Sequence, residues 1–145
     1  MELTLERGSV IFIDTAPLIY FFEAHPKYQN LLSELFDQVV EQQCQMVTSL
    51  ITYVEIVTAP LKSGDEKLAG KYREFFTNSS HIKVHAFDLA IADETAKIRA
   101  LYGFKTPDAI QLATAKMMGA DLVLSNDLQW KKIKELRIIL MDELL

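Results

Sequence analysis

The residues VIFIDTAP at positions 10–17 decide the fold, because they join a short strand to a helix through an acid. Positions 10–13 form a β-branched and aromatic run, which is typical of a buried strand. Asp14 follows this run directly. Pro17 suits the first turn of a helix, capped by one of the two residues before it and running to about Glu23. The stretch therefore predicts a strand, an acid and a helix in immediate succession.

The same alternation continues along the chain. Further strands are expected at 44–48, 82–86, 121–124 and 137–141, and further helices at 27–43, 50–59, 65–77, 88–102, 106–118 and 128–134. Pro60 is expected to end the second of these helices. Strands that alternate with helices favour parallel pairing. We therefore expect an α/β fold in which a central, mostly parallel sheet lies between two helical layers, as a single domain over residues 1–145.

Composition excludes several classes of protein. Half of the 145 residues are hydrophobic and 24% are charged, as in an ordinary globular domain. No apolar run reaches the roughly 18 residues that a membrane span needs, and the first residues lack the apolar core of a signal peptide. We therefore expect a cytoplasmic protein. Cys44 is the only cysteine, which excludes an internal disulfide framework. The net charge of −5 argues against coating nucleic acid by charge alone.

Four acids stand out by their placement next to core-forming residues. Asp14 and Asp127 follow apolar strands, and ligands of parallel sheets bind beyond the carboxyl ends of the strands. Glu55 lies among Val and Ile in a helix expected to be mostly buried, and Asp108 opens an almost wholly apolar helix. Converging carboxylates take up protons or bind a divalent cation, and oxygen ligands suit Mg²⁺ or Mn²⁺. Phosphodiester hydrolysis is the reaction that this arrangement serves best.

Each acid alone also has a structural explanation. The helix macrodipole by itself favours Asp108 in a first turn, and Asp127 within Ser-Asn-Asp suits a turn. A capping or salt-bridge role remains open for Glu55. The placement of the four acids together carries more weight than any one of them.

Four stretches together resemble the motifs of the PIN-domain family. These are VIFIDTAPLI at 10–19, TYVEI at 52–56, KTPDAIQLATA at 105–115 and LSND at 124–127. They occur in order and at family-like spacing over nearly the whole chain, and the third is the most diagnostic. The length is similar to that of single-domain toxins of VapBC-type toxin–antitoxin systems.

The resemblance implies a Mg²⁺- or Mn²⁺-dependent nuclease that cleaves RNA. It assigns catalysis and metal binding to the same four acids, namely Asp14, Glu55, Asp108 and Asp127. Thr15 and Ser125 would support the metal ligands by hydrogen bonds. Toxins of this type are usually homodimers, and a cognate protein antitoxin blocks their pocket. The resemblance therefore leads us to expect a homodimer and a protein antitoxin.

Other residues and other functions remain open. Lys105 and Lys62 are candidates for phosphate contact, although solvated surface lysines are the simpler interpretation. The alternative functions are a non-catalytic PIN-like module that binds RNA or protein, and a housekeeping RNA-processing nuclease. Phosphotransfer proteins also place an acid after the first strand, but a dehalogenase-type phosphatase needs a second Asp at position 16, where this chain has Ala.

Overall fold

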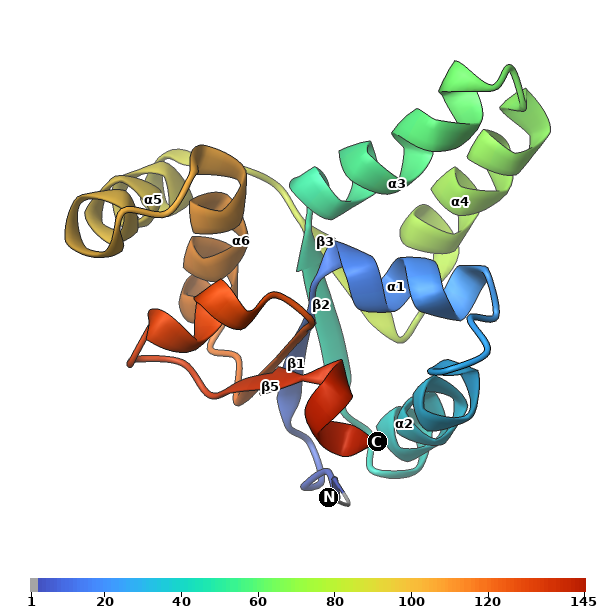
Figure 1. The fold of residues 1–145 in the computed structure, drawn as a ribbon, viewed down its shortest axis with the longest axis horizontal. Coiled ribbons are helices and arrows are strands. Elements are labelled where there is room, and N and C mark those ends of the chain that lie inside the picture. The colour runs from blue at the N-terminus through green and yellow to red at the C-terminus, as the bar shows by residue number, and fades with distance from the viewer. Residues whose placement is uncertain (1–2) are drawn as a thin grey trace.

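The computed structural model describes residues 3–145 as three layers, with a sheet between two groups of helices (Figure 1). Residues 1 and 2 lie outside the described residues. The first two residues of the expected domain, and of the segment expected to lack a signal peptide, are therefore not described. None of the helices in residues 3–145 is long and apolar enough to cross a membrane.

The sheet has five strands in the order β3-β2-β1-β4-β5. Their bounds are Val10–Ile13 for β1, Gln45–Ser49 for β2, Ile82–His85 for β3, Leu122–Ser125 for β4 and Ile138–Leu140 for β5. Every pairing between neighbouring strands is parallel. The expectation of a mostly parallel sheet is thus confirmed. From β1 the chain adds β2 and then β3 on one side. It then returns and adds β4 and β5 on the other side of β1.

Within the described part of the chain, six α-helices and two short 3₁₀ helices connect and flank the strands. The α-helices are Thr15–Phe22 (α1), Gln29–Glu41 (α2), Leu50–Lys62 (α3), Glu66–Asn78 (α4), Leu89–Tyr102 (α5) and Thr106–Met117 (α6), and the 3₁₀ helices are Leu128–Lys132 (η1) and Met141–Leu144 (η2). Helices α1 to α4 lie on one side of the sheet, whereas α5, α6 and η1 lie on the other (Figure 1). The sequence pattern did not predict η2.

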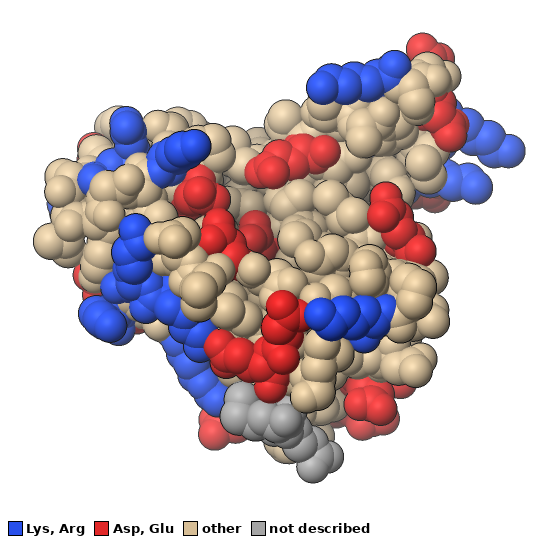
Figure 2. Space-filling view, in the orientation of Figure 1, with Lys and Arg blue, Asp and Glu red and all other residues tan. Residues whose placement is uncertain are grey.

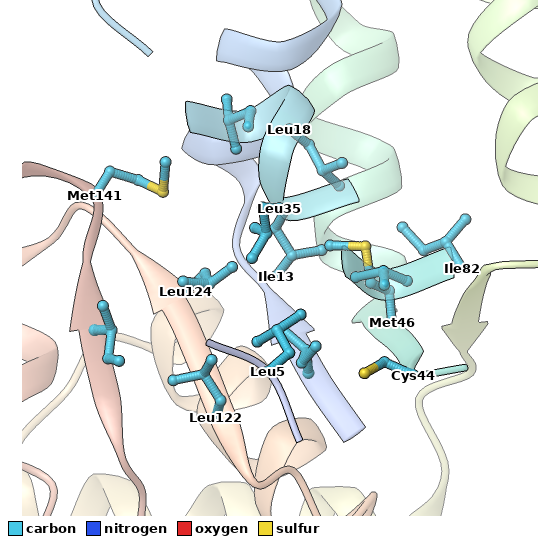
Figure 3. Close-up of a cluster of buried hydrophobic side chains, with 14 of the residues drawn as sticks. Leu5, Ile13, Leu18, Leu35, Cys44, Met46, Ile82, Leu122, Leu124 and Met141 are labelled. Atoms are coloured by element: carbon cyan, nitrogen blue, oxygen red, sulfur yellow. The ribbon is translucent and has the colours of Figure 1, made fainter. Parts of the chain in front are cut away.

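Alternating side chains of the central strand supply both cores. Ile11 and Ile13 point into the core beneath α1 and α2, where Leu18 and Leu35 pack (Figure 3). Phe12, between them, points into the opposite core beneath α5 and α6. All three strand residues are fully buried. This is the burial expected of a parallel strand that is covered on both faces.

Most elements begin and end within two residues of the sequence-based expectation, and two differences are physically informative. Helix α3 continues through Pro60 to Lys62 instead of ending before the proline. Pro60 is buried, and its position in the last turn removes only one helical hydrogen bond, so packing offsets the loss. Asp14, and not one of the two residues after it, is the N-cap of α1. This second difference matters for the site, because it fixes one carboxylate to a helix start.

Candidate active site

A pocket of about 540 Å³ opens beyond the carboxyl ends of β1 and β4. This is where the order of strand building reverses, the usual ligand position in a parallel α/β sheet. All four acids singled out from the sequence line it: Asp14, Glu55, Asp108 and Asp127. Acidic side chains gather in the hollow between the α5–α6 side and the α3 side of the molecule (Figure 2). The structure thus brings together side chains from four separate segments.

Asp14 is the most deeply placed of these acids. Its Oδ1 accepts a hydrogen bond from the Thr15 N–H at 2.7 Å, and its Oδ2 accepts one from the Ser125 hydroxyl at 2.8 Å. Burial raises the pKa of Asp14 from 3.8 to about 6, against these hydrogen bonds and with help from the nearby negative charges of Glu55 and Asp108. Near neutral pH the carboxylate is therefore held in its charged form at a cost that a cation would remove.

Glu55 and Asp108 stand nearer the mouth of the pocket. Partial desolvation raises the pKa of Glu55, the charge of Asp108 adds to the rise, and the nearby Thr15 hydroxyl opposes it. Partial desolvation also raises the pKa of Asp108, with a further contribution from the charge of Asp127. Glu55 itself is exposed on α3. The expectation that it sits in a mostly buried helix is wrong for this face, because only the opposite face of α3 packs on the core.

Asp127 and Ser125 form the turn that leaves β4. Asp127 caps η1 by accepting a hydrogen bond from the Gln129 N–H at 2.9 Å. The Ser125 hydroxyl donates to Asp14 and accepts from the Asp127 N–H at 3.1 Å. The fully buried Ser125 therefore links two of the acids. Asp127 combines the turn role weighed from the sequence with a place in the pocket wall.

Sequence reasoning missed two polar residues at this site, Asn126 and Gln111. Asn126 and Tyr20 line the pocket, and the Asn126 amide donates to the Tyr28 hydroxyl at 3.2 Å. Gln111 is buried beneath the pocket and donates from Nε2 to Asp14 Oδ1 at 3.2 Å. The available signal for Gln111 was a polar residue inside an otherwise apolar helical run. The apolar residues on both sides of Gln111 obscured this signal.

The two candidate lysines occupy different positions. Lys105 is exposed at the N-cap of α6, close enough that its positive charge lowers the pKa of Asp108, against the larger effect of desolvation. Lys62 is exposed at the end of α3 and lies outside the lining of the pocket. Only Lys105 is therefore placed beside the acids.

The chemistry of the donor set fits a hard divalent cation. The four acids offer only carboxylate oxygens, and within residues 3–145 no salt bridge involves any of them. The indole N–H of Trp130 is buried and lies near enough to Asp108 to lower the pKa of that carboxyl group. It has no hydrogen-bond partner at normal distance and geometry among the described residues. A fixed, charged Asp108 carboxylate would give it one.

The acids do not meet as tightly as expected from the sequence. In the described part of the chain, no three His, Cys, Asp or Glu side chains lie close enough to hold an ion between them. Carboxylates without a counter-ion repel one another, which disfavours a tighter group. Mg²⁺ retains several water ligands in proteins and is held by one or two carboxylates. The arrangement therefore suits an ion bound partly through water.

Fold and site together define an α/β domain with a carboxylate-lined pocket at the strand carboxyl ends, an arrangement suited to phosphate chemistry. A comparison with family models makes the class specific: the PIN domain model matches residues 11–136. The chain belongs to the PIN domain family, whose members are typically metal-dependent nucleases. No curated protein sequence matches it.

Solved structures confirm the fold. The VapBC2 complex of Rickettsia felis, bound to a promoter DNA fragment, contains a chain similar over 90% of this chain and 98% of its own, at 15% identity and a TM-score of 0.73. DNA-bound VapBC of Salmonella typhimurium gives 92% and 98% coverage, 23% identity and a TM-score of 0.73. VapC20 of Mycobacterium tuberculosis, a toxin that cleaves the sarcin-ricin loop, gives 88% and 98% coverage, 14% identity and a TM-score of 0.65. At these identities, the likeness establishes the fold alone.

Proposed function

We propose that this protein is a metal-dependent endoribonuclease that hydrolyses RNA phosphodiester bonds in the pocket beyond the carboxyl ends of β1 and β4. One observation carries the proposal: four carboxylates from four separate segments line one pocket, and no lysine or arginine among the described residues forms a salt bridge with them. Acids arranged in this way are costly unless a cation binds. Membership of the PIN domain family supports the same chemistry.

The proposed metal ligands are the four acids, and the proposed ion is Mg²⁺ or Mn²⁺. When bound, the ion would polarise a phosphoryl oxygen and activate water for attack on phosphorus. Asp14 would be the fixed ligand, because hydrogen bonds from Thr15 and Ser125 hold both of its oxygens. Glu55, exposed at the mouth, is free to adjust as RNA enters.

The substrate is a polyanion, so it needs positive charge beside the acidic pocket. Lys105, next to Asp108, is the proposed phosphate contact at the scissile position. Lys62 lies about two helical turns beyond Glu55 along α3, on the order of 10 Å. We assign it contact with a more distant phosphate of the RNA.

We further propose that the protein is the toxin of a toxin–antitoxin pair that acts on cytoplasmic RNA. The structural neighbours include VapBC and other toxin–antitoxin complexes, which favours a protein antitoxin as partner. The homodimer is proposed from the family resemblance alone. Expression of the chain alone should arrest growth, and co-expression of an adjacent small reading frame should relieve the arrest. A housekeeping nuclease would give no arrest.

Cleavage of RNA by the purified protein tests the proposal directly. A labelled single-stranded RNA should be cut in the presence of Mn²⁺ or Mg²⁺ and remain intact with EDTA, giving a 5′-phosphate and a 3′-hydroxyl. Asp14→Asn should abolish cutting without unfolding the protein, while the exposed Asp93→Asn on α5 should cut as the parent does. If the parent binds RNA but never cuts it with either ion, the chain is the non-catalytic module.

A further inference from the structure

Gln111 is a buried carboxamide in the apolar part of α6. Only 2% of it is exposed, and it lies beneath the acidic pocket without lining it. A buried amide is costly unless its hydrogen-bonding groups find partners. Here the partners come from three other segments, namely the start of α1, the end of β2 and the first turn of α3. Gln111 is therefore a cross-link between the segments that carry the acids.

The neighbours of Gln111 set the orientation of its amide. The Ser49 hydroxyl oxygen accepts from the Ile51 N–H at 3.1 Å, and its proton is donated to Gln111 Oε1. The amide nitrogen then faces Thr52 Oγ1 at 2.7 Å and Asp14 Oδ1 at 3.2 Å. The reverse orientation would place the amide oxygen against a carboxylate oxygen. The donor of this group is thus directed at Asp14 by the fold.

We infer that Gln111 is a positioning residue that fixes the Asp14 carboxylate for ion binding. The inference rests on the proposed function of the pocket. The carboxylate has three donors: the Thr15 N–H and the Gln111 amide on Oδ1, and the Ser125 hydroxyl on Oδ2. Without Gln111, the only donor to Oδ1 left among residues 3–145 is the backbone N–H of the next residue, which moves with Asp14 itself. No side chain of α6 would then fix the orientation of the Asp14 carboxylate.

Gln111→Met tests the inference, because methionine keeps the length and volume of the side chain and removes its donor. Thr114→Val is the matched control: Thr114 is a buried polar residue of the same helix whose hydroxyl bonds only its own helix, at Ile110. We expect Gln111→Met to weaken Mn²⁺ binding or lower kcat about 10- to 100-fold, the usual cost of losing a partner of a metal ligand. Its KM for RNA should be unchanged, because Gln111 does not line the pocket.

Mn²⁺ affinity should be measured directly by calorimetry on the folded protein, alongside cleavage rates and melting temperatures. The inference is wrong if Gln111→Met keeps parental Mn²⁺ affinity and kcat, or loses no more of either than Thr114→Val at a similar melting temperature. If Gln111→Met does not fold, Ser49→Ala replaces it. This variant frees the amide, so it should give the same kind of loss in smaller degree, and parental values would overturn the inference.

Failure of the proposed function is a separate outcome. A parent that neither binds Mn²⁺ nor cleaves RNA would refute the nuclease proposal. The positioning role is then decided by the crystal structure of Gln111→Met: a carboxylate of Asp14 in its original orientation overturns it, and a rotated one supports it.

Discussion

Replacing Asp14 by Asn should stabilise the ion-free protein near neutral pH. Burial raises the folded-state pKa of Asp14 from 3.8 to about 6. The folded protein therefore binds this proton more tightly than the unfolded chain does. At about 1.4 kcal/mol per pKa unit, the charged side chain destabilises the fold by about 3 kcal/mol at pH values well above 6. Asn removes this cost and keeps an oxygen for the Thr15 N–H.

The sign of the pH dependence follows from the same shift. The stability tied to the Asp14 proton is fully present below about pH 4 and is lost as the pH rises through about 6. The difference in unfolding free energy between Asp14→Asn and the parent should thus grow from near zero at about pH 4 to about 3 kcal/mol at about pH 7.5. For a chain of this size, 3 kcal/mol corresponds to roughly 6–12 °C in melting temperature.

Chemical denaturation in EDTA at several pH values measures this difference. Asp93→Asn, which removes an exposed acid from α5, controls for the change in net charge and should track the parent within about 0.5 kcal/mol. A difference between Asp14→Asn and the parent that stays constant from about pH 4 to 7.5 would falsify the reasoning. So would a variant that is less stable than the parent at the higher pH.

Three further outcomes follow from the same pocket. Mn²⁺ or Mg²⁺ should raise the melting temperature of the parent and leave Asp14→Asn almost unchanged, because the ion binds only the assembled carboxylates; equal shifts in scanning fluorimetry would contradict this. Mn²⁺ affinity of the parent, followed by calorimetry, should weaken as the pH falls through about 6, because protonated Asp14 is a poor ligand; an affinity independent of pH would count against Asp14 as a ligand. Ser125→Ala removes the donor to Asp14 Oδ2 and the acceptor for the Asp127 N–H, so initial cleavage rates should fall about 10- to 100-fold; a parental kcat would show that this link is dispensable.

Local patterns were sufficient to predict most elements of the fold. The strand at Val10–Ile13 is correct at both ends, and the expected end of the helix at Tyr102 is confirmed by Gly103, which takes the left-handed conformation with φ of 75°. The order of strands could not be predicted, because it depends on pairings between distant segments that leave no local trace. Pro60 misled for a related reason: its burial against the core, which offsets the lost hydrogen bond, is a tertiary contact.

The site was predictable in its acids and less so in their surroundings. Asp14 and Asp127 follow strands whose carboxyl ends meet, so their convergence could be foreseen. The tightness of the group could not be foreseen, since the distances between these side chains depend on tertiary packing that leaves no trace in the sequence. Gln111 was hidden because its partners come from other segments of the chain, and those partners are visible only once α6 lies against α1 and α3.

The link from Asp14 to Ser125 joins positions 111 residues apart. A chain that has emerged only as far as α6 therefore holds Asp14, Glu55 and Asp108 without β4 and the turn that complete the pocket. Under the proposed function, catalysis therefore waits until β4 has paired with β1.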